Sequence, residues 1–217
     1  MLIDKNFDFL KESAKKFLTL YENDKYQLDQ KFKDFIKTKS NGSKFGLAIF
    51  SNYEIINSGS LDLKDSANNI IFSDIIKDKD TIRVYNIHLE SLKMNTAKEN
   101  FGTKDSDKLL KQMEASFQKQ AKQVELFLDH EKKWTGKKIL CGDFNNTAFS
   151  WVYRELSKNK QDAFKEAGKG LGKTFNYWYP LRIDFILLDS SFDINNFKTF
   201  NVPYSDHYPI LARINLK

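Results

Sequence analysis

Short apolar runs bounded by turn residues recur along most of the chain, and this pattern predicts a core rich in β-strands. Turn residues at 51–54 and 77–80 separate several of the runs. Runs that follow one another so closely between 45 and 88 are expected to pair antiparallel. The predicted strands are 45–51, 54–60, 68–77, 80–88, 137–142, 182–188 and 208–215.

Two segments have a helical period instead. Between Lys104 and Lys133 apolar residues recur every three or four positions, which is typical of an amphipathic helix covering a sheet. Its predicted buried face comprises Leu110, Met113, Phe117, Ala121, Val124 and Leu128. A shorter helix is expected through Trp151, Tyr153 and Leu156, with Ser150 as its cap. A sheet with covering helices predicts an α/β fold, and 217 residues at 41% hydrophobic fit one domain over 1–217.

Polar side chains able to hold a metal and a phosphate stand at the ends of the predicted strands. Period-2 geometry points Asp143 and Asn145 the same way after a buried run that stops at Gly142. Two of the three histidines also fall at strand ends beside Asn or Asp. The candidates are Asn86, His88, Asp143, Asn145, Asp184, Asp206 and His207.

Several of these candidates also have an ordinary structural interpretation. Asp143 with Asn145, and separately Asp206, are residue types that bond their own backbone in turns. Asp184 interrupts an apolar run and needs a partner, which is either His207 or Arg182 on the same strand face. In the first case Arg182 is free to serve a phosphate.

Other chemically distinctive residues favour structural roles. His130 falls near the end of the long helix, where a cation suits the helix dipole, and is expected to be structural or solvent-exposed. The single cysteine, Cys141, sits in an apolar strand and is expected to pack as a small core residue. A cluster of aromatic residues beside the 182–188 strand is expected to pack in the core, and the alternative is that they stack on bases or contact lipid. These residues are Phe175, Tyr177, Trp178 and Tyr179, with Phe101 further upstream.

Four sequence blocks in order resemble the endonuclease/exonuclease/phosphatase superfamily, the DNase I-like metal-dependent phosphohydrolases. They are NIHLES from Asn86, GDFN from Gly142, RIDFIL from Arg182 and SDHYPI from Ser205. The segment 45–51 resembles the family's strand in which a Gly leads into an apolar run closing on Ser. The resemblance implies a four-layer α/β sandwich of two mainly antiparallel sheets flanked by helices, which periodicity alone does not show.

The resemblance also implies roles for the candidates. His207 would activate water, with Asp184 orienting its ring, while Asp143 and Asn145 would orient the nucleophile and contact phosphate or metal. His88 would bind the phosphate or protonate the leaving group, with Asn86 a weaker candidate for phosphate binding. Asp206 would join a site for Mg²⁺ or Mn²⁺, cations that oxygen ligands suit. The expected activity is metal-dependent hydrolysis of phosphate esters, with a phosphodiesterase or nuclease-like enzyme preferred.

The start of the chain departs from the family, whose members open with a strand ending in a functional Asn and then place a metal-binding Glu, commonly after Gln. No opening Asn strand is present, and 6–13 resembles the helix that follows it. Glu22, preceded by Tyr21, lies where the metal-binding Glu belongs, although the segment could equally continue as one helix. We therefore expect an N-terminally incomplete domain, and the alternative function is a truncated or catalytically impaired member that acts as a binding module.

Charge and composition leave the substrate and the compartment open. The net charge of +6 would attract a polyanion, but lysines are interleaved with acids along the chain and form no stripe. No stretch reaches the roughly 18 apolar residues of a membrane span, so we expect a soluble monomer as written, although a missing N-terminal segment could carry a membrane anchor. The substrate loops are expected at 91–103 and 158–179, and nucleic acid, phospholipid or a small phosphodiester all remain open.

Overall fold

The computed structural model describes residues 32–38, 44–92, 106–202 and 204–217. In chain order the elements are β1 (Phe32–Thr38), β2 (Lys44–Phe50), β3 (Glu54–Ser60), β4 (Ile70–Lys77), β5 (Asp80–His88), α2 (Ser106–Glu131), β6 (Lys137–Asp143), α3 (Trp151–Leu156), β7 (Gln161–Asp162), α4 (Ala163–Ala167), β8 (Asp184–Leu188), β9 (Phe192–Thr199) and β10 (Ile210–Leu216). Every strand expected from the sequence is present within a few residues of its expected bounds. β1, β7 and β9 were not expected.

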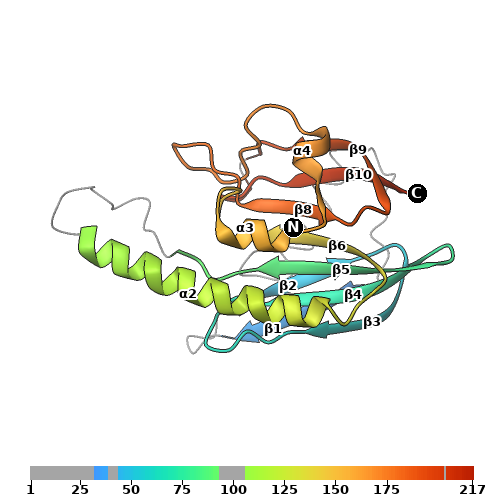
Figure 1. Ribbon diagram of the computed structural model, residues 1–217, viewed down its shortest axis with the longest axis horizontal. Coiled ribbons are helices and arrows are strands. Elements are labelled where there is room, and N and C mark those ends of the chain that lie inside the picture. The colour runs from blue at the N-terminus through green and yellow to red at the C-terminus, as the bar shows by residue number, and fades with distance from the viewer. Residues whose placement is uncertain (1–31, 39–43, 93–105, 203) are drawn as a thin grey trace.

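A six-stranded mixed sheet with the order β3-β4-β5-β6-β8-β7 forms the centre of the fold. Its neighbours pair antiparallel, as expected for β3, β4 and β5, except that β5 and β6 run parallel. A second layer consists of two antiparallel hairpins, β1–β2 and β9–β10, so the small sheet is divided in the described part of the chain. The long helix α2 runs along the central sheet, and α3 lies close to β6 and β8 (Figure 1).

Strand alternation divides the core into two layers. Tyr85 and Ile87 of β5, Leu140 of β6, and Phe185 and Leu187 of β8 face the helices and pack with α2 and α3. The intervening residues of the same strands face the hairpins, where Ile82 and Leu188 pack with β9, β10 and α4. The polar residues that end these strands therefore lie on the hairpin face, between the layers.

The buried face of α2 agrees with the expected one at Val124 and Leu128, which pack in the core, and differs from it elsewhere. Leu110 is 63% exposed and Phe117 41% exposed, whereas Gln120, Gln123 and Phe127 are buried. Gln120 donates from Nε2 to the Glu90 carbonyl at 2.7 Å, and Gln123 Oε1 accepts from the Glu90 backbone N–H at 2.8 Å. Apolar spacing misplaced the face because this stripe is half polar and is used to hold the loop that follows β5.

The segment 158–179, expected as a loop, contains β7 and α4. Asp162 caps α4 by accepting from the Phe164 backbone N–H at 2.9 Å, and it also accepts from Arg182 Nη1 at 2.8 Å. Arg182 therefore pairs with Asp162 and not with Asp184. It is also absent from the residues that line the active-site cavity described below. The α3 expectation is confirmed, since the Ser150 side chain accepts from the Tyr153 backbone N–H at the helix start.

Candidate active site

Three candidate side chains form a row across the central sheet. His88 ends β5, Asp143 ends β6 and Asp184 begins β8, and the register pairs His88 with Asp143 and Asp143 with Asp184. All three follow the alternation that points them to the hairpin face. The fold therefore brings together, at one level of three adjacent strands, residues that lie almost a hundred positions apart in the sequence.

The turn after β6 is shaped by its backbone. Gly142 has φ +143°, and a Cβ added there would lie 1.9 Å from the Ile87 carbonyl oxygen, so only glycine fits between the two parallel strands. Asn145 has φ 48° and its backbone N–H donates to Asp143 Oδ1 at 2.7 Å, while its Nδ2 donates to the Leu89 carbonyl at 2.9 Å. The turn-forming interpretation of Asp143 and Asn145 is thus correct, and the same turn fixes the Asp143 carboxylate in place.

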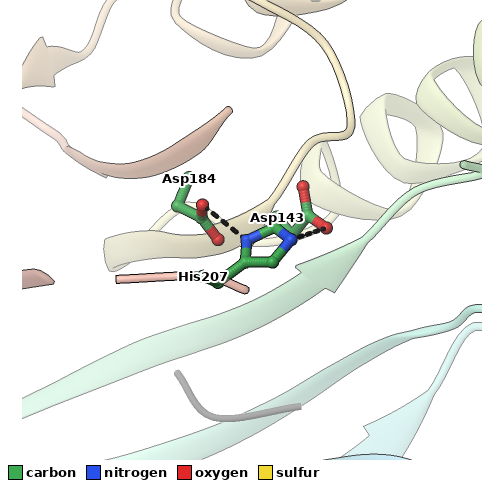
Figure 2. A group of neighbouring side chains, drawn as sticks. All are labelled: Asp143, Asp184 and His207. Carbon is green, nitrogen blue, oxygen red and sulfur yellow. Dashed lines mark hydrogen bonds and ion pairs between the residues drawn. The ribbon is translucent and has the colours of Figure 1, made fainter. Parts of the chain in front are cut away.

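His207 approaches this row from the loop before β10. Its Nδ1 lies 2.9 Å from Asp184 Oδ2 and its Nε2 lies 3.9 Å from Asp143 Oδ2 (Figure 2). Thr174 supports the arrangement, because its Oγ1 accepts from the Asp184 backbone N–H at 3.1 Å and its carbonyl accepts from Tyr208 N at 2.7 Å. Of the two partners open for Asp184, the structure selects His207.

The electrostatics of the row are strongly perturbed. Burial by itself disfavours a charged His207, but the hydrogen bond to Asp184 and the charges of Asp184, Asp143 and Asp206 outweigh it and raise its pKa to about 9. Burial, together with the charge of Asp184, raises the pKa of Asp143 to about 8. Burial and the charge of His207 lower the pKa of His88 to about 4, although its Nε2 lies 3.6 Å from Asp143 Oδ2. At neutral pH these shifts place a proton on His207 and on Asp143 and leave His88 neutral.

A cavity of about 510 Å³ opens over these residues. Asp206 stands exposed at its edge, where its Oδ1 accepts from the Ser205 hydroxyl at 3.1 Å, and its charge contributes to the raised pKa of both Asp143 and His207. The lining residues are Asn68, His88, Ser91, Leu92, Asp143, Asn145, Asn146, Thr147, Phe175, Leu181, Ile183, Asp206 and His207.

The donor set fits a hard divalent cation. One ligand atom each from Asp143, Asp184 and His207 lie within 4.8 Å of one another. Asp184 Oδ2 and His207 Nδ1 already bond each other, and Asp206 supplies a further carboxylate to the cavity lining beside Asp143. Burial and the charge of Asp184 raise the pKa of Asp143, and a cation bound beside its carboxylate would act against that rise.

One expected member of the site lies elsewhere, and another is not described. Asn86 is buried and its Nδ2 donates to the Ala48 carbonyl of β2 at 3.1 Å, so it joins the two layers and does not line the cavity. Glu22 lies outside the described residues. Conversely, Asn68, Asn146 and Thr147 line the cavity without having been expected. For Asn146 and Thr147, the only feature of the sequence that pointed to the site was their position directly after the GDFN block.

The remaining distinctive residues behave structurally or stand exposed. His130 Nδ1 lies 3.1 Å from the Tyr85 hydroxyl, which gives it the structural role expected. Cys141 Sγ donates to the Tyr85 carbonyl, and burial raises the pKa of its thiol, so it does not act as a nucleophile. The core expectation for the aromatic cluster was wrong at Trp178 and Tyr179, which are 78% and 55% exposed at the tip of a loop. Phe101 lies outside the described residues.

The model of the Endonuclease/Exonuclease/phosphatase family matches residues 6–207. The chain belongs to this family. Proteins of the family hydrolyse phosphate esters and generally use divalent metal ions. No curated protein matches the chain.

Solved structures show the same fold. A family protein from Leptotrichia buccalis is similar with a TM-score of 0.62 and 18% identity, over 98% of this chain and 79% of that one. The human Nocturnin catalytic domain with bound sulfate has a TM-score of 0.60 and 12% identity, over 97% of this chain and 77% of that one. A Bacteroides thetaiotaomicron mannosyl-6-phosphatase has a TM-score of 0.57 and 16% identity, over 85% and 77%. In the described part of this chain, no helix combines the length and apolar character needed to cross a membrane.

Proposed function

We propose that this protein is a metal-dependent phosphodiesterase in which His207 activates the attacking water. The observation that carries the proposal is the hydrogen bond between His207 Nδ1 and Asp184 Oδ2, placed beside Asp143 in an open cavity. Membership of a family of phosphate-ester hydrolases supports the reaction class. The preference for diesters rests on the resemblance and is the part that the experiment below tests.

His207 acts as the general base and Asp184 as its positioning partner. With Nδ1 held by Asp184, Nε2 is the ring nitrogen available to take a proton from water in the cavity. The buried Asp184 carboxylate stabilises the imidazolium that forms, which is the division of labour found in other hydrolases that use an Asp–His pair. The base is active only when His207 has lost its proton, so activity rises with pH as His207 deprotonates.

The other members of the row contact the phosphate and the leaving group. His88 is neutral and lines the cavity, so it can donate a hydrogen bond to a phosphoryl oxygen or to the departing oxygen. Asn145 stands at the same wall, where its carboxamide can contact the phosphate. Asp143 lies between the two histidines, with His88 Nε2 at 3.6 Å and His207 Nε2 at 3.9 Å, and orients the water between them.

We assign the cation site to Asp143 and Asp206, completed by Glu22 as in the family pattern, with Mg²⁺ or Mn²⁺ as the ion. The bound ion would supply positive charge that stabilises the phosphoryl oxygens and offsets the carboxylates around His207. Asp206 is exposed at the cavity edge, where it can meet substrate and ion together.

The test compares hydrolysis of bis-p-nitrophenyl phosphate, a diester, with that of p-nitrophenyl phosphate, a monoester. Each is measured with Mg²⁺, with Mn²⁺ and with EDTA. The proposal predicts metal-dependent release of p-nitrophenol, faster from the diester. Faster turnover of the monoester would make the protein a phosphomonoesterase. Absence of both activities from a folded sample that still binds Mn²⁺ would favour the binding-module alternative.

A further inference from the structure

A second cavity, of about 520 Å³, lies behind the wall of the candidate active site. It is formed by the end of α4 and the segment after it, by β9 and the residues that follow β9, and by Tyr208 just before β10. The lining residues are Ala167, Lys169, Gly172, Lys173, Asn196, Phe197, Lys198, Thr199, Asn201 and Tyr208. We call it the lysine cavity.

The lining of the lysine cavity is positively charged. Three lysines, Lys169, Lys173 and Lys198, are among the lining residues, and no Asp or Glu is among the described residues that line it. Lys173 Nζ donates to the Tyr177 carbonyl at 2.8 Å, which uses one of its three N–H groups and leaves the others able to meet a ligand. Neutral donors complete the lining, since Asn196, Asn201 and Thr199 carry amide and hydroxyl groups. Such a set suits an anion with several acceptor oxygens.

The wall between the two cavities is thin. His207 and Phe175 line the active-site cavity, whereas their neighbours Tyr208 and Lys173 line the lysine cavity. Their segments bond directly, because Phe175 bridges to His207 and the Tyr208 backbone N–H donates to the Thr174 carbonyl at 2.7 Å. The two cavities therefore share this wall, and a substrate with two phosphate groups would have to span it to occupy both.

The geometry points to the lysine cavity as a subsite for a second phosphate group of the substrate, distinct from the phosphate that is cleaved. The inference rests on the proposed function, and it narrows the substrate class to phosphate esters that carry a further phosphate close to the scissile bond. Lysine recognises phosphate as a point charge and does not need the planar fork of arginine, so three lysines with neutral donors match this group.

The kinetic test uses two substrates that differ by one phosphate: the p-nitrophenyl ester of thymidine 5′-phosphate, with and without a 3′-phosphate. The test variant is Lys169→Gln/Lys198→Gln, because Lys173 also holds the adjacent loop through Tyr177. The matched control is Lys79→Gln/Lys133→Gln, which removes the same charge at exposed positions preceding β5 and β6, the far ends of the strands that carry the site.

We expect the 3′-phosphate to raise kcat/KM by about tenfold in the native protein, because each exposed charge pair typically changes a binding constant a few-fold. This advantage is largely lost in the test variant and retained in the control. No advantage in the native protein, or an equal loss in both variants, would overturn the inference, since an equal loss indicates only the overall charge of the protein.

A binding measurement separates failure of the subsite from failure of the proposed hydrolysis. Thymidine 3′,5′-bisphosphate is added in EDTA while the side-chain NMR signals of Lys169 and Lys198 are followed. Shifts with the bisphosphate, and much smaller shifts with thymidine 5′-phosphate, support the subsite even if no ester is hydrolysed. Equal shifts from inorganic phosphate at the same concentration would show a site for a free anion and would contradict the inference.

Discussion

The Asp184–His207 pair predicts a specific pH dependence of stability that an Asp184→Asn substitution exposes. In the folded protein the pKa of His207 is about 9, against 6.5 for an ordinary histidine. A raised histidine pKa contributes stability that is fully present below pH 6.5 and is lost as the pH rises through 9. The rise corresponds to at most about 3 kcal/mol.

The free energy of unfolding of the native protein and of Asp184→Asn is measured by urea denaturation in EDTA between pH 6 and pH 10. The native protein is expected to exceed the variant most at pH 6, and the difference shrinks toward pH 10 by up to about 3 kcal/mol. Asp143 changes this stability difference in the same direction. The charge of Asp184 helps to raise the pKa of Asp143, so ionised Asp143 destabilises the native protein at high pH more than it destabilises Asp184→Asn. An NMR titration of the His207 ring checks that its pKa falls.

A matched control is Asp74→Asn, which removes another buried carboxylate paired with a cation. Asp74 binds Arg83 through two hydrogen bonds of 2.7 and 2.8 Å. Because a guanidinium stays protonated throughout this range, the destabilisation by Asp74→Asn should be the same at pH 6 and pH 10. A stability difference for Asp184→Asn that stays constant or widens with pH would refute the assigned pair.

Three further predictions concern the residues around the site. Gly142→Ala should destabilise the fold by about 3 kcal/mol or more in urea unfolding, since the added Cβ would lie 1.9 Å from the Ile87 carbonyl oxygen; a variant of native stability would contradict the assigned turn. Asp143→Asn should lower hydrolysis by about a hundredfold. In EDTA, the same variant should gain stability relative to the native protein as pH rises from 4 through 8, because the raised pKa of Asp143 makes its ionisation unfavourable in the folded state. Tyr85→Phe should cost about 1 kcal/mol of stability by removing the bond to His130 and leave turnover unchanged; a loss of turnover would give that pair a catalytic role.

The site residues could be predicted from the sequence where strand periodicity determines the direction of their side chains. Asp143 and His88 end apolar runs whose alternation sets the face of each terminal side chain, so their convergence could be expected. Periodicity alone left His207 and Arg182 both suitable as the partner of Asp184, and only the family resemblance favoured His207. The choice follows from Asp162, whose position at the start of α4 captures Arg182.

The fold was predictable where the buried face is apolar and was missed where it is not. β9 carries only Phe192 and Phe197 as buried apolar residues among polar ones, so its sequence lacks the alternation of a strand. The face of α2 was predicted correctly at Val124 and Leu128 but missed at Gln120 and Gln123, which hold backbone groups of the loop after β5. In α2, polar contacts, which leave no periodic signal, decide which face is buried.

The central claim is tested most directly by turnover of bis-p-nitrophenyl phosphate with Mn²⁺ by the native protein, His207→Ala and His130→Ala. The two variants remove one imidazole each, but only His207 faces the cavity. We predict that metal-dependent turnover is lost in His207→Ala and kept in His130→Ala. Turnover that survives in a folded His207→Ala protein would contradict the assignment of His207 as the base.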